Sequence, residues 1–269
     1  RFAPRIILPP PTTTASPMPA FMAAAISAAM FFNSSPSMPP SPGFEKVTQR
    51  PEGESNRGRF VVLEGVDGAG KSTQARMLGE WMEACGIPFT LTREPGGTEV
   101  GEAIRNLVKD RPELSVPPET ELLLYLAART AFVKQVALPV LERGELLIAD
   151  RFSLSTYAYQ GYGRGLDLDE VRRMDRFASG GLMPDIYLVL DLPAEEGRAR
   201  QKAAGKREDR LEGSCEAFLE AVGRGYRELA GTDASIRLVD ARGTTLEVHA
   251  RVREVLRREL PETFAICED

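Results

Sequence analysis

The sequence predicts an α/β fold in which helices cover both faces of a parallel sheet. Two observations support this prediction: short apolar runs recur along the chain from residue 59 onward, and longer helical segments separate them. The apolar runs are also unbroken, as is typical of strands that are buried on both faces of a parallel sheet. We find no internal repeat in the sequence.

The predicted strands lie at residues 60–63, 89–92, 146–149, 186–190 and 236–239. Each is a short run dominated by Val, Ile, Leu, Phe or Thr, the composition that favours strands. Helices are expected at residues 72–85, 119–141, 214–230 and 245–259. Because strands and helices alternate, the chain is expected to form βαβ units with parallel strands.

The composition is that of a water-soluble globular protein. The chain has 269 residues, 42% of them hydrophobic and 27% charged, and a formal net charge of −5. This length allows one large domain or two small ones. No run reaches the roughly 18 uninterrupted apolar residues of a membrane span. The acidic balance argues against nucleic-acid binding through bulk charge, although a local basic cluster stays compatible with it.

Cysteine and histidine usage excludes several kinds of site. Cys85, Cys215 and Cys267 lie far apart and form no CxxC pair, which excludes a disulfide framework and a cysteine-rich zinc site. The same usage fits a reducing compartment. The single histidine, His249, excludes a histidine-cluster metal site and disfavours a histidine-centred catalytic triad.

Residues 1–58 are expected to form a disordered leader, the folded domain is expected at 59–260, and a tail at 261–269. The leader is rich in Pro, Ser, Ala, Thr and Met, and no acidic residue precedes Glu45. It is interpreted either as a transit peptide to a mitochondrion or plastid, or as an artefact of a start codon assigned too far upstream in a cytoplasmic protein. The apolar stretch 18–32 also resembles a signal-peptide core, but the cysteine usage argues against export.

A phosphate-binding loop follows the first predicted strand. Residues 65–72 match GxxxxGK[ST] between a strand and a helix, which is the context that this motif requires. Its backbone N–H groups can surround a phosphate, Lys71 can reach the β- and γ-phosphates, and the Ser72 hydroxyl can ligate Mg²⁺. The predicted ATP-binding residues are Gly65, Val66, Asp67, Gly68, Ala69, Gly70, Lys71, Ser72 and Thr73.

Two classes of P-loop protein are disfavoured. No Asn is followed by Lys, as a guanine-reading Asn-Lys-x-Asp motif requires. The strand at 146–149 leads into Asp150 and Arg151 rather than the Asp-Glu pair of a motor ATPase. An arginine at this position suits the binding of a second phosphate, which indicates a phosphotransferase with an anionic acceptor.

Three segments together resemble one family. They are LEGVDGAGKST at 63–73, TREPGGT at 92–98 and DRFSLSTYAYQG at 150–161. In this order and spacing they resemble the thymidylate kinases of the bacterial type, and the resemblance extends over residues 59–260. It implies a five-stranded parallel sheet flanked by helices, as in other P-loop nucleoside-monophosphate kinases.

The resemblance implies transfer of the γ-phosphoryl group of Mg·ATP to dTMP, which gives dTDP and ADP for dTTP synthesis. It also implies a homodimer, and we expect neither a nucleic-acid partner nor a membrane. Two alternatives stay open: a kinase for another monophosphate such as UMP or CMP, and a nucleotide-binding regulatory module without turnover. The intact set Lys71, Ser72, Asp150 and Arg151 disfavours the regulatory module.

The resemblance also implies roles at the phosphates. Arg93 and Arg151 are expected to hold the acceptor phosphate; the alternatives are a surface ion pair for Arg93 and an ion pair with Asp150 for Arg151. Asp150 is expected near Mg²⁺ or beside Arg151, and Asp67 near the 3′-hydroxyl of the acceptor. The predicted catalytic residues here are Lys71, Asp67 and Arg151, and the predicted metal ligands are Ser72 and Asp150.

Tyr125 and Arg129 resemble the thymine pocket of the family, and their spacing of four residues places them on one helix face. Tyr125 is then expected to stack on the base, where many relatives have Phe, and Arg129 to donate to its O4. An ordinary core aromatic is the alternative for Tyr125. Thr156 and Gln160 resemble groups that read the pyrimidine edge, and Tyr159 resembles one that disfavours a 2′-hydroxyl.

The basic stretch 198–212 resembles the lid that covers ATP in this family. The interior of the phosphate loop, at 66–69, has no basic residue, so the transition-state arginine is expected in the lid. The candidate catalytic arginines are Arg200, Arg207 and Arg210. A solvated helix face is the alternative for such a charged run.

Overall fold

The computed structural model describes residues 57–111, 113–205 and 216–267. The chain divides into two units, Arg1–Glu45 and Lys46–Asp269, and all described residues belong to the second. Apart from its last two positions, the expected leader therefore lies outside the described residues. Within the second unit the strands form one five-stranded sheet in the order β2-β3-β1-β4-β5, and every neighbouring pair is parallel. The predicted fold class is confirmed.

Each strand is one residue longer than predicted, and the added residue is charged every time. The strands are β1 (Phe60–Glu64), β2 (Phe89–Arg93), β3 (Leu146–Asp150), β4 (Ile186–Asp191) and β5 (Ile236–Asp240). The apolar pattern ends one residue early because strand pairing continues through the charged residue, as where Arg93 lies opposite Asp150 and Asp191 opposite Asp240. Since the strands are parallel, these charged residues all lie at the carboxyl edge, where α/β folds bind ligands.

The predicted helices are present. The helix α2 (Lys71–Cys85) ends at Gly86, whose φ of 67° forms a left-handed cap, and α10 (Thr245–Glu259) begins with a capping box of Thr244 and Glu247. The long helix predicted at 119–141 consists of α4 (Pro118–Phe132), the π-helix η1 (Val133–Ala137) and α5 (Leu138–Glu142). The described part of the helix predicted at 214–230 is α9 (Glu216–Ala230).

The remaining helices were not predicted. They are α3 (Glu99–Lys109), α6 (Ser153–Thr156), the π-helix η2 (Tyr157–Gly163), α7 (Leu168–Ser179), α8 (Ala194–Ala203) and α11 (Pro261–Phe264). Two of them carry a local signal that could have located them. Thr98 caps α3 by accepting from the N–H of Gly101, and Asp167 caps α7 by accepting from the N–H of Glu170.

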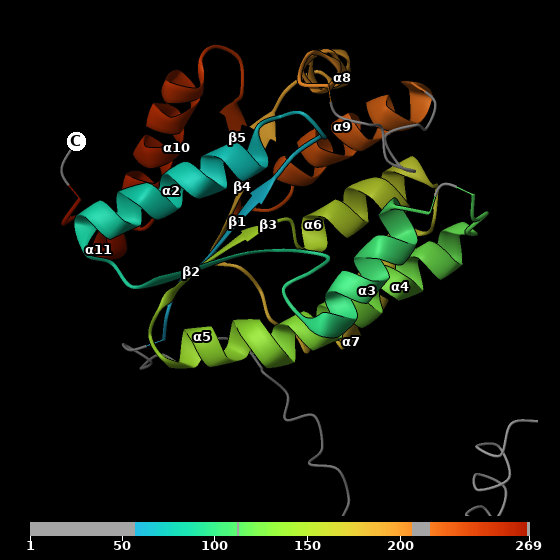
Figure 1. Ribbon diagram of the computed structural model, residues 1–269, viewed down its shortest axis with the longest axis horizontal. Helices are drawn as coiled ribbons and strands as arrows, with labels where there is room; N and C mark the ends of the chain where they lie inside the picture. The colour runs from blue at the N-terminus through green and yellow to red at the C-terminus, as the bar shows by residue number, and fades with distance from the viewer. Residues whose placement is uncertain (1–56, 112, 206–215, 268–269) are drawn as a thin grey trace, which may run out of the picture. The chain divides into compact units, whose positions relative to one another are not determined.

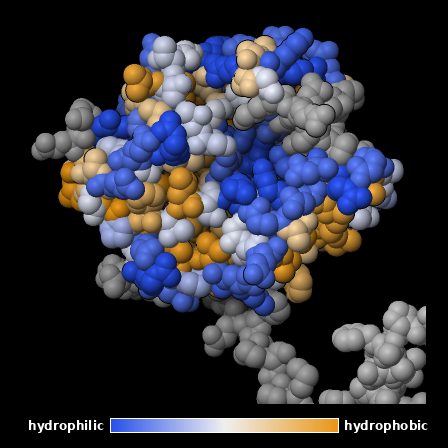
Figure 2. All heavy atoms as spheres, in the orientation of Figure 1, coloured by the Kyte–Doolittle hydropathy of each residue, from blue (hydrophilic) through white to orange (hydrophobic). Residues whose placement is uncertain are grey.

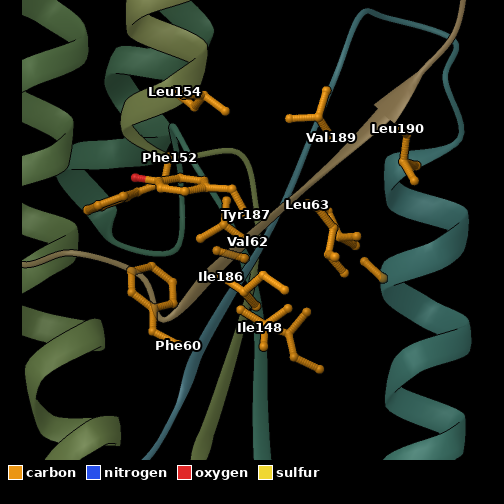
Figure 3. Close-up of a cluster of buried hydrophobic side chains, with 14 of the residues drawn as sticks. Phe60, Val62, Leu63, Ile148, Phe152, Leu154, Ile186, Tyr187, Val189 and Leu190 are labelled. Atoms are coloured by element: carbon orange, nitrogen blue, oxygen red, sulfur yellow. The ribbon is translucent and has the colours of Figure 1, made fainter. Parts of the chain in front are cut away.

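Helices cover both faces of the sheet (Figure 1). The helices α2 and α10 pack together on one face, while α5, η2 and α9 belong to the layer on the other. Strand residues contact the two layers, as Figure 3 shows: Leu63 and Leu190 point towards α2, whereas Tyr187 lies on the opposite side, together with Phe152 from the segment after β3. All four of these side chains are buried.

The segment after α10 packs against the end of α2. Phe264 of α11 is buried and stacks on Trp81, with ring centroids 5.4 Å apart. Cys267 forms a disulfide with Cys85, and their Cα atoms are 5.2 Å apart. The sequence analysis excluded a disulfide framework and did not predict this single disulfide, because a separation of 182 residues gives no local sign of the contact. Part of the predicted tail is therefore packed onto the domain.

The helical stretch Pro118–Glu142 has the length and the hydropathy of a membrane span, although 39% of its apolar window is buried inside the protein. Arg129, near its middle, is buried against acidic side chains. One such helix is weak evidence for a membrane, since core helices of water-soluble proteins have the same length and composition. The absence of a membrane partner stays a prediction.

Candidate active site

The phosphate-binding loop joins β1 to α2 at the carboxyl edge of the sheet. Gly65, Gly68 and Gly70 have φ values of 129°, 81° and 97°, which residues with a side chain rarely adopt. A Cβ atom on Gly68 would lie 2.1 Å from the carbonyl oxygen of Gly197 in α8. The glycines therefore allow both the path of the loop and its close contact with α8.

Lys71 is buried beneath this loop. Its Nζ donates to the carbonyl oxygens of Gly65, at 3.1 Å, and Val66, at 2.8 Å. Burial lowers the pKa of Lys71 to about 8, the Arg151 guanidinium adds to this, and the Asp67 carboxylate opposes it. An anionic phosphate above the loop would favour the charged amine, so the site is suited to a nucleotide rather than to a neutral ligand.

Ser72 and Asp150 lie side by side at the edge of the loop. The Ser72 hydroxyl donates to Asp150 Oδ2 over 2.6 Å. The two residues predicted to bind the metal ion are thus brought together from the start of α2 and the end of β3. Their hydroxyl and carboxylate oxygens are ligands of the type that Mg²⁺ prefers.

Asp67 and Arg151 form an ion pair across the loop. Arg151 has a φ of 77°, the one left-handed residue other than glycine among those described. Tyr159 joins the pair: its hydroxyl donates to Asp67 Oδ2 at 2.8 Å and accepts from Arg151 Nη2 at 3.1 Å. Burial alone would raise the pKa of Asp67, but Arg151 and Lys71 hold it well below its usual range. The carboxylate that binds Arg151 is therefore Asp67 and not Asp150.

Glu64, which the sequence analysis missed, holds the segment that carries Arg151. Its Oε1 accepts from the backbone N–H of Phe152 at 2.8 Å, and its Oε2 accepts from the Ser155 hydroxyl at 2.5 Å and the Tyr226 hydroxyl at 3.0 Å. Ser155 and Tyr226 also contact Arg151 Nη1, at 2.9 and 3.3 Å. Burial raises the pKa of Glu64, against the nearby charge of Arg151. The sequence signal that could have identified Glu64 is its position as a charged residue at the end of an apolar strand.

Arg93 ends β2 and lines the cavity above the phosphate loop. Its Nη2 lies 3.0 Å from both carboxylate oxygens of Glu102, and both side chains are exposed. The structure therefore shows the surface ion pair that was the alternative for Arg93, at a position from which it borders the site. Arg105 and Lys109 of α3 line the same cavity and were not predicted.

Arg129 is buried at the back of a second cavity. Its Nε and Nη2 donate to Glu94 Oε2, at 3.0 and 2.7 Å, and its Nη1 donates to Asp175 Oδ1 at 2.5 Å and Thr156 Oγ1 at 3.0 Å. Burial raises the pKa of Glu94 to about 7, and the nearby Asp175 and Glu64 add to this, while Arg129 opposes it. Glu94 and Asp175 were not predicted as site residues.

The other predicted base-pocket residues line this second cavity as well. Tyr125 is half-buried there, four residues before Arg129 on α4. Gln160 lies at the wall, and its Nε2 donates to the buried Glu121 at 2.8 Å. Thr156, Tyr159 and Gln160 lie on α6 and η2, and π-helical turns of this kind are frequent at functional sites.

The two cavities meet. The one around Arg129 and the one above the phosphate loop share the lining residues Asp67, Glu94, Lys109 and Arg151. Figure 2 shows a hollow lined by hydrophilic side chains on the viewed face. The described residues therefore form one continuous site with a phosphate-binding half and a half suited to a flat polar ring.

Arg200 is the predicted lid arginine that the structure describes. It lies on α8, lines the cavity above the phosphate loop, and donates from Nη2 to the carbonyl oxygen of Ala241 at 3.0 Å. The other two candidates, Arg207 and Arg210, lie outside the described residues. The role of the lid stays a prediction.

Comparisons with known proteins identify the same family as the sequence segments. The family model of thymidylate kinase matches residues 63–252. The chain is 43% identical over 197 residues to the thymidylate kinase of Pelotomaculum thermopropionicum, covering 73% of this chain and 91% of that protein. It is 48% identical over 179 residues to the thymidylate kinase of Synechococcus sp. strain CC9605, covering 64% and 85%. The crystal structure of thymidylate kinase from Ehrlichia chaffeensis has a TM-score of 0.61 and 29% identity, covering 74% and 99% of the two chains.

Proposed function

The chain belongs to the thymidylate kinase family, and we propose how its residues carry out the reaction of that family. The protein is a nucleoside-monophosphate kinase that phosphorylates dTMP to dTDP with ATP as the phosphoryl donor. One observation carries the assignment of residues: the cavity of the phosphate loop and the cavity of Arg129 meet at Asp67 and Arg151. A donor and an acceptor nucleotide bound in the two cavities would place their phosphates at this junction.

We assign ATP to the cavity above the phosphate loop and dTMP to the cavity of Arg129. Lys71 would bind the β- and γ-phosphates, and Arg151 and Arg93 the phosphate of dTMP. Because phosphoryl transfer depends on alignment and charge neutralisation, the reaction needs no histidine or other strong base. The Asp67–Arg151–Tyr159 contacts hold the arginine in place before substrate arrives, which lowers the cost of ordering it later.

Mg²⁺ is the proposed metal ion, with Ser72 and Asp150 as its protein contacts. Among the described residues, no group of three or more His, Cys, Asp or Glu side chains could hold a metal ion by itself. This fits Mg²⁺, which usually binds through one or two protein oxygens together with water and substrate phosphates. When bound, the ion would neutralise charge on the transferring phosphates.

Three further assignments belong to this proposal. Arg200 is proposed to approach the phosphates of ATP from α8, because it already lines their cavity. The protein is proposed to act as a homodimer without a nucleic-acid or membrane partner. Its compartment is proposed to depend on residues 1–58: cytoplasmic if they are an artefact, and a mitochondrion or plastid if they are a transit peptide.

The test is a coupled ADP-release assay with Mg·ATP and a panel of dTMP, dUMP, dCMP, UMP, CMP, AMP and GMP. We expect dTMP to have the highest kcat/KM of the panel. A higher value for another monophosphate would overturn the assignment of Tyr125 and Arg129 to the base. ATP binding without turnover of any acceptor would favour the regulatory module.

A further inference from the structure

The Arg129 guanidinium has almost no hydrogen-bonding capacity left for a ligand. It carries five N–H groups and cannot accept a hydrogen bond. Among the described residues, the Nε–H and one Nη2–H point to Glu94, and the two Nη1–H groups point to Asp175 and Thr156. One Nη2–H therefore has no hydrogen-bond partner within the part of the chain that the structure describes, on a side chain that is 3% exposed and lines the acceptor cavity.

The partners of Arg129 come from different elements and hold the guanidinium from opposite sides. Glu94 follows β2, Asp175 lies on α7, and Thr156 lies on α6. The ring of Phe152 contacts the guanidinium 4.9 Å from its centroid. A long side chain that would otherwise sample several rotamers is thus held in one orientation before any ligand binds.

From these contacts we infer that Glu94 and Asp175 are specificity-determining positioning residues, which leave Arg129 a single N–H directed at the acceptor base. The inference deepens the proposed function and rests on the assignment of dTMP to this cavity. A carbonyl oxygen on the base satisfies that N–H. An amino group at the same place would put one donor against another in a buried position, which disfavours binding of that base.

The buried acids are needed for this selectivity because they occupy the other donors. Without Glu94, the Nε–H and a second Nη2–H would lose their acceptor, and the guanidinium could turn within the cavity. The cavity would then present a movable cluster of donors rather than one fixed donor. A base with a carbonyl group would lose its hydrogen bond from Arg129 and therefore affinity. A base with an amino group does not make this hydrogen bond, so its affinity would change less.

The test compares full-length wild type with Glu94→Gln and Asp175→Asn in the ADP-release assay. We expect the KM for dTMP and for dUMP, which both carry the carbonyl, to rise at least about tenfold in each variant. The KM for ATP and the kcat at saturating dTMP should stay within about twofold, because the phosphate half keeps its contacts. The preference for dTMP over dCMP should fall by about the same factor as the KM rises.

Asp185→Asn is the matched control. Asp185 accepts from Arg59 Nη1 at 3.0 Å and from the Phe60 backbone N–H at 2.8 Å, at the start of the central strands. Its side chain is 12% exposed, so its substitution also disturbs a partly buried carboxylate–arginine pair. The control should leave the KM for dTMP and the dTMP-to-dCMP preference within about twofold of wild type.

Three results would decide against the inference. The first is that the KM for dTMP and the preference for dTMP over dCMP stay unchanged in both variants. The second is an equal loss of affinity for dTMP, dCMP and ATP, which would indicate a general structural role. The third needs no variant: nitrogen NMR of the wild type should resolve separate Nη signals for a fixed Arg129, and one averaged signal would show free rotation. If wild type itself does not use dTMP, the proposed function fails instead.

Discussion

Asp67–Arg151 and Glu94–Arg129 are both carboxylate–arginine pairs in the acceptor cavity, yet the pKa values of their acids shift in opposite directions. The pKa of Asp67 is held well below its usual range, and that of Glu94 is raised to about 7. The Asp67 and Arg151 side chains are 17% and 14% exposed, and those of Glu94 and Arg129 are 2% and 3% exposed. Depth of burial accounts for part of this difference.

The local balance of charge accounts for the rest. Asp67 lies near three cations, Arg151, Lys71 and Lys109, which together outweigh its burial. Glu94 instead shares one guanidinium with Asp175, and a second acid, Glu64, lies nearby. The phosphate half of the site therefore has an excess of positive charge for anionic ligands, whereas the base half is balanced for a neutral ring.

Arg151→Ala removes the cation of the first pair and is expected to have the largest effect. The acceptor phosphate loses a ligand at the junction of the two cavities, and Asp67 loses its closest cation. We expect kcat/KM for dTMP to fall about 10³-fold. The measurement is the ADP-release assay, with Arg143→Ala as the control because Arg143 pairs with a carboxylate, Glu145, outside both cavities. A loss below tenfold would contradict the role of Arg151.

Asp67→Asn keeps the shape of the first pair and removes its negative charge. Arg151 and Tyr159 lose the acceptor that orients them, so we expect kcat to fall about 10²-fold. The folded pKa of Asp67 lies below its ordinary value of 3.8, so this carboxylate contributes stability above that pH that is lost as the pH falls. The variant should therefore lose less stability than wild type on acidification. Parallel curves of unfolding free energy against pH would contradict this.

Glu94→Gln tests the opposite sign in the second pair. The folded pKa of Glu94, about 7, lies above its ordinary value of 4.5. Its contribution to stability is therefore fully present below pH 4.5 and is lost as the pH rises through 7. Between pH 5 and 8, wild type should lose stability relative to the variant by roughly 1–3 kcal/mol. Urea unfolding at several pH values measures this, and an unchanged difference would show that the pair is an ordinary ion pair.

Thr156→Val is expected to have the smallest effect, and it tests one hydrogen bond of Arg129 within the base half. The variant removes one acceptor of Arg129 and leaves both carboxylates in place. A neutral hydrogen bond of this kind contributes about 1 kcal/mol, so the KM for dTMP should rise roughly threefold to tenfold. Steady-state kinetics measures it. A fall of kcat with an unchanged KM would place Thr156 in phosphoryl transfer instead.

The sequence predicts the phosphate half of the site far better than the base half. The phosphate loop is a contiguous motif, and Lys71, Ser72 and Asp67 follow from it. The structure also brings Arg151 to this loop, since β1 and β3 are neighbours with Leu63 opposite Asp150. Because the carboxyl ends of neighbouring parallel strands lie side by side, residues predicted at those ends are also predicted to lie close together.

The contacts of the base half depend on pairings that no local pattern reveals. Glu94, Arg129 and Asp175 are 35 and 46 residues apart, on elements that meet only after folding. Arg129 was found because its segment resembles the thymine pocket of the family, whereas its two acids were missed. Glu64 was missed for the same reason, because its carboxylate accepts hydrogen bonds from residues as distant in sequence as Tyr226.

The most direct test of the two-pair account is carbon NMR of the Asp and Glu carboxyl groups in the nucleotide-free protein, titrated from pH 3 to 9. We predict that the Glu94 signal titrates with a midpoint near 7, and that Asp67 stays ionised across the range. Substitution of each residue assigns its signal. A Glu94 midpoint at or below 4.5 would contradict the account, because the two pairs would then carry the same balance of charge.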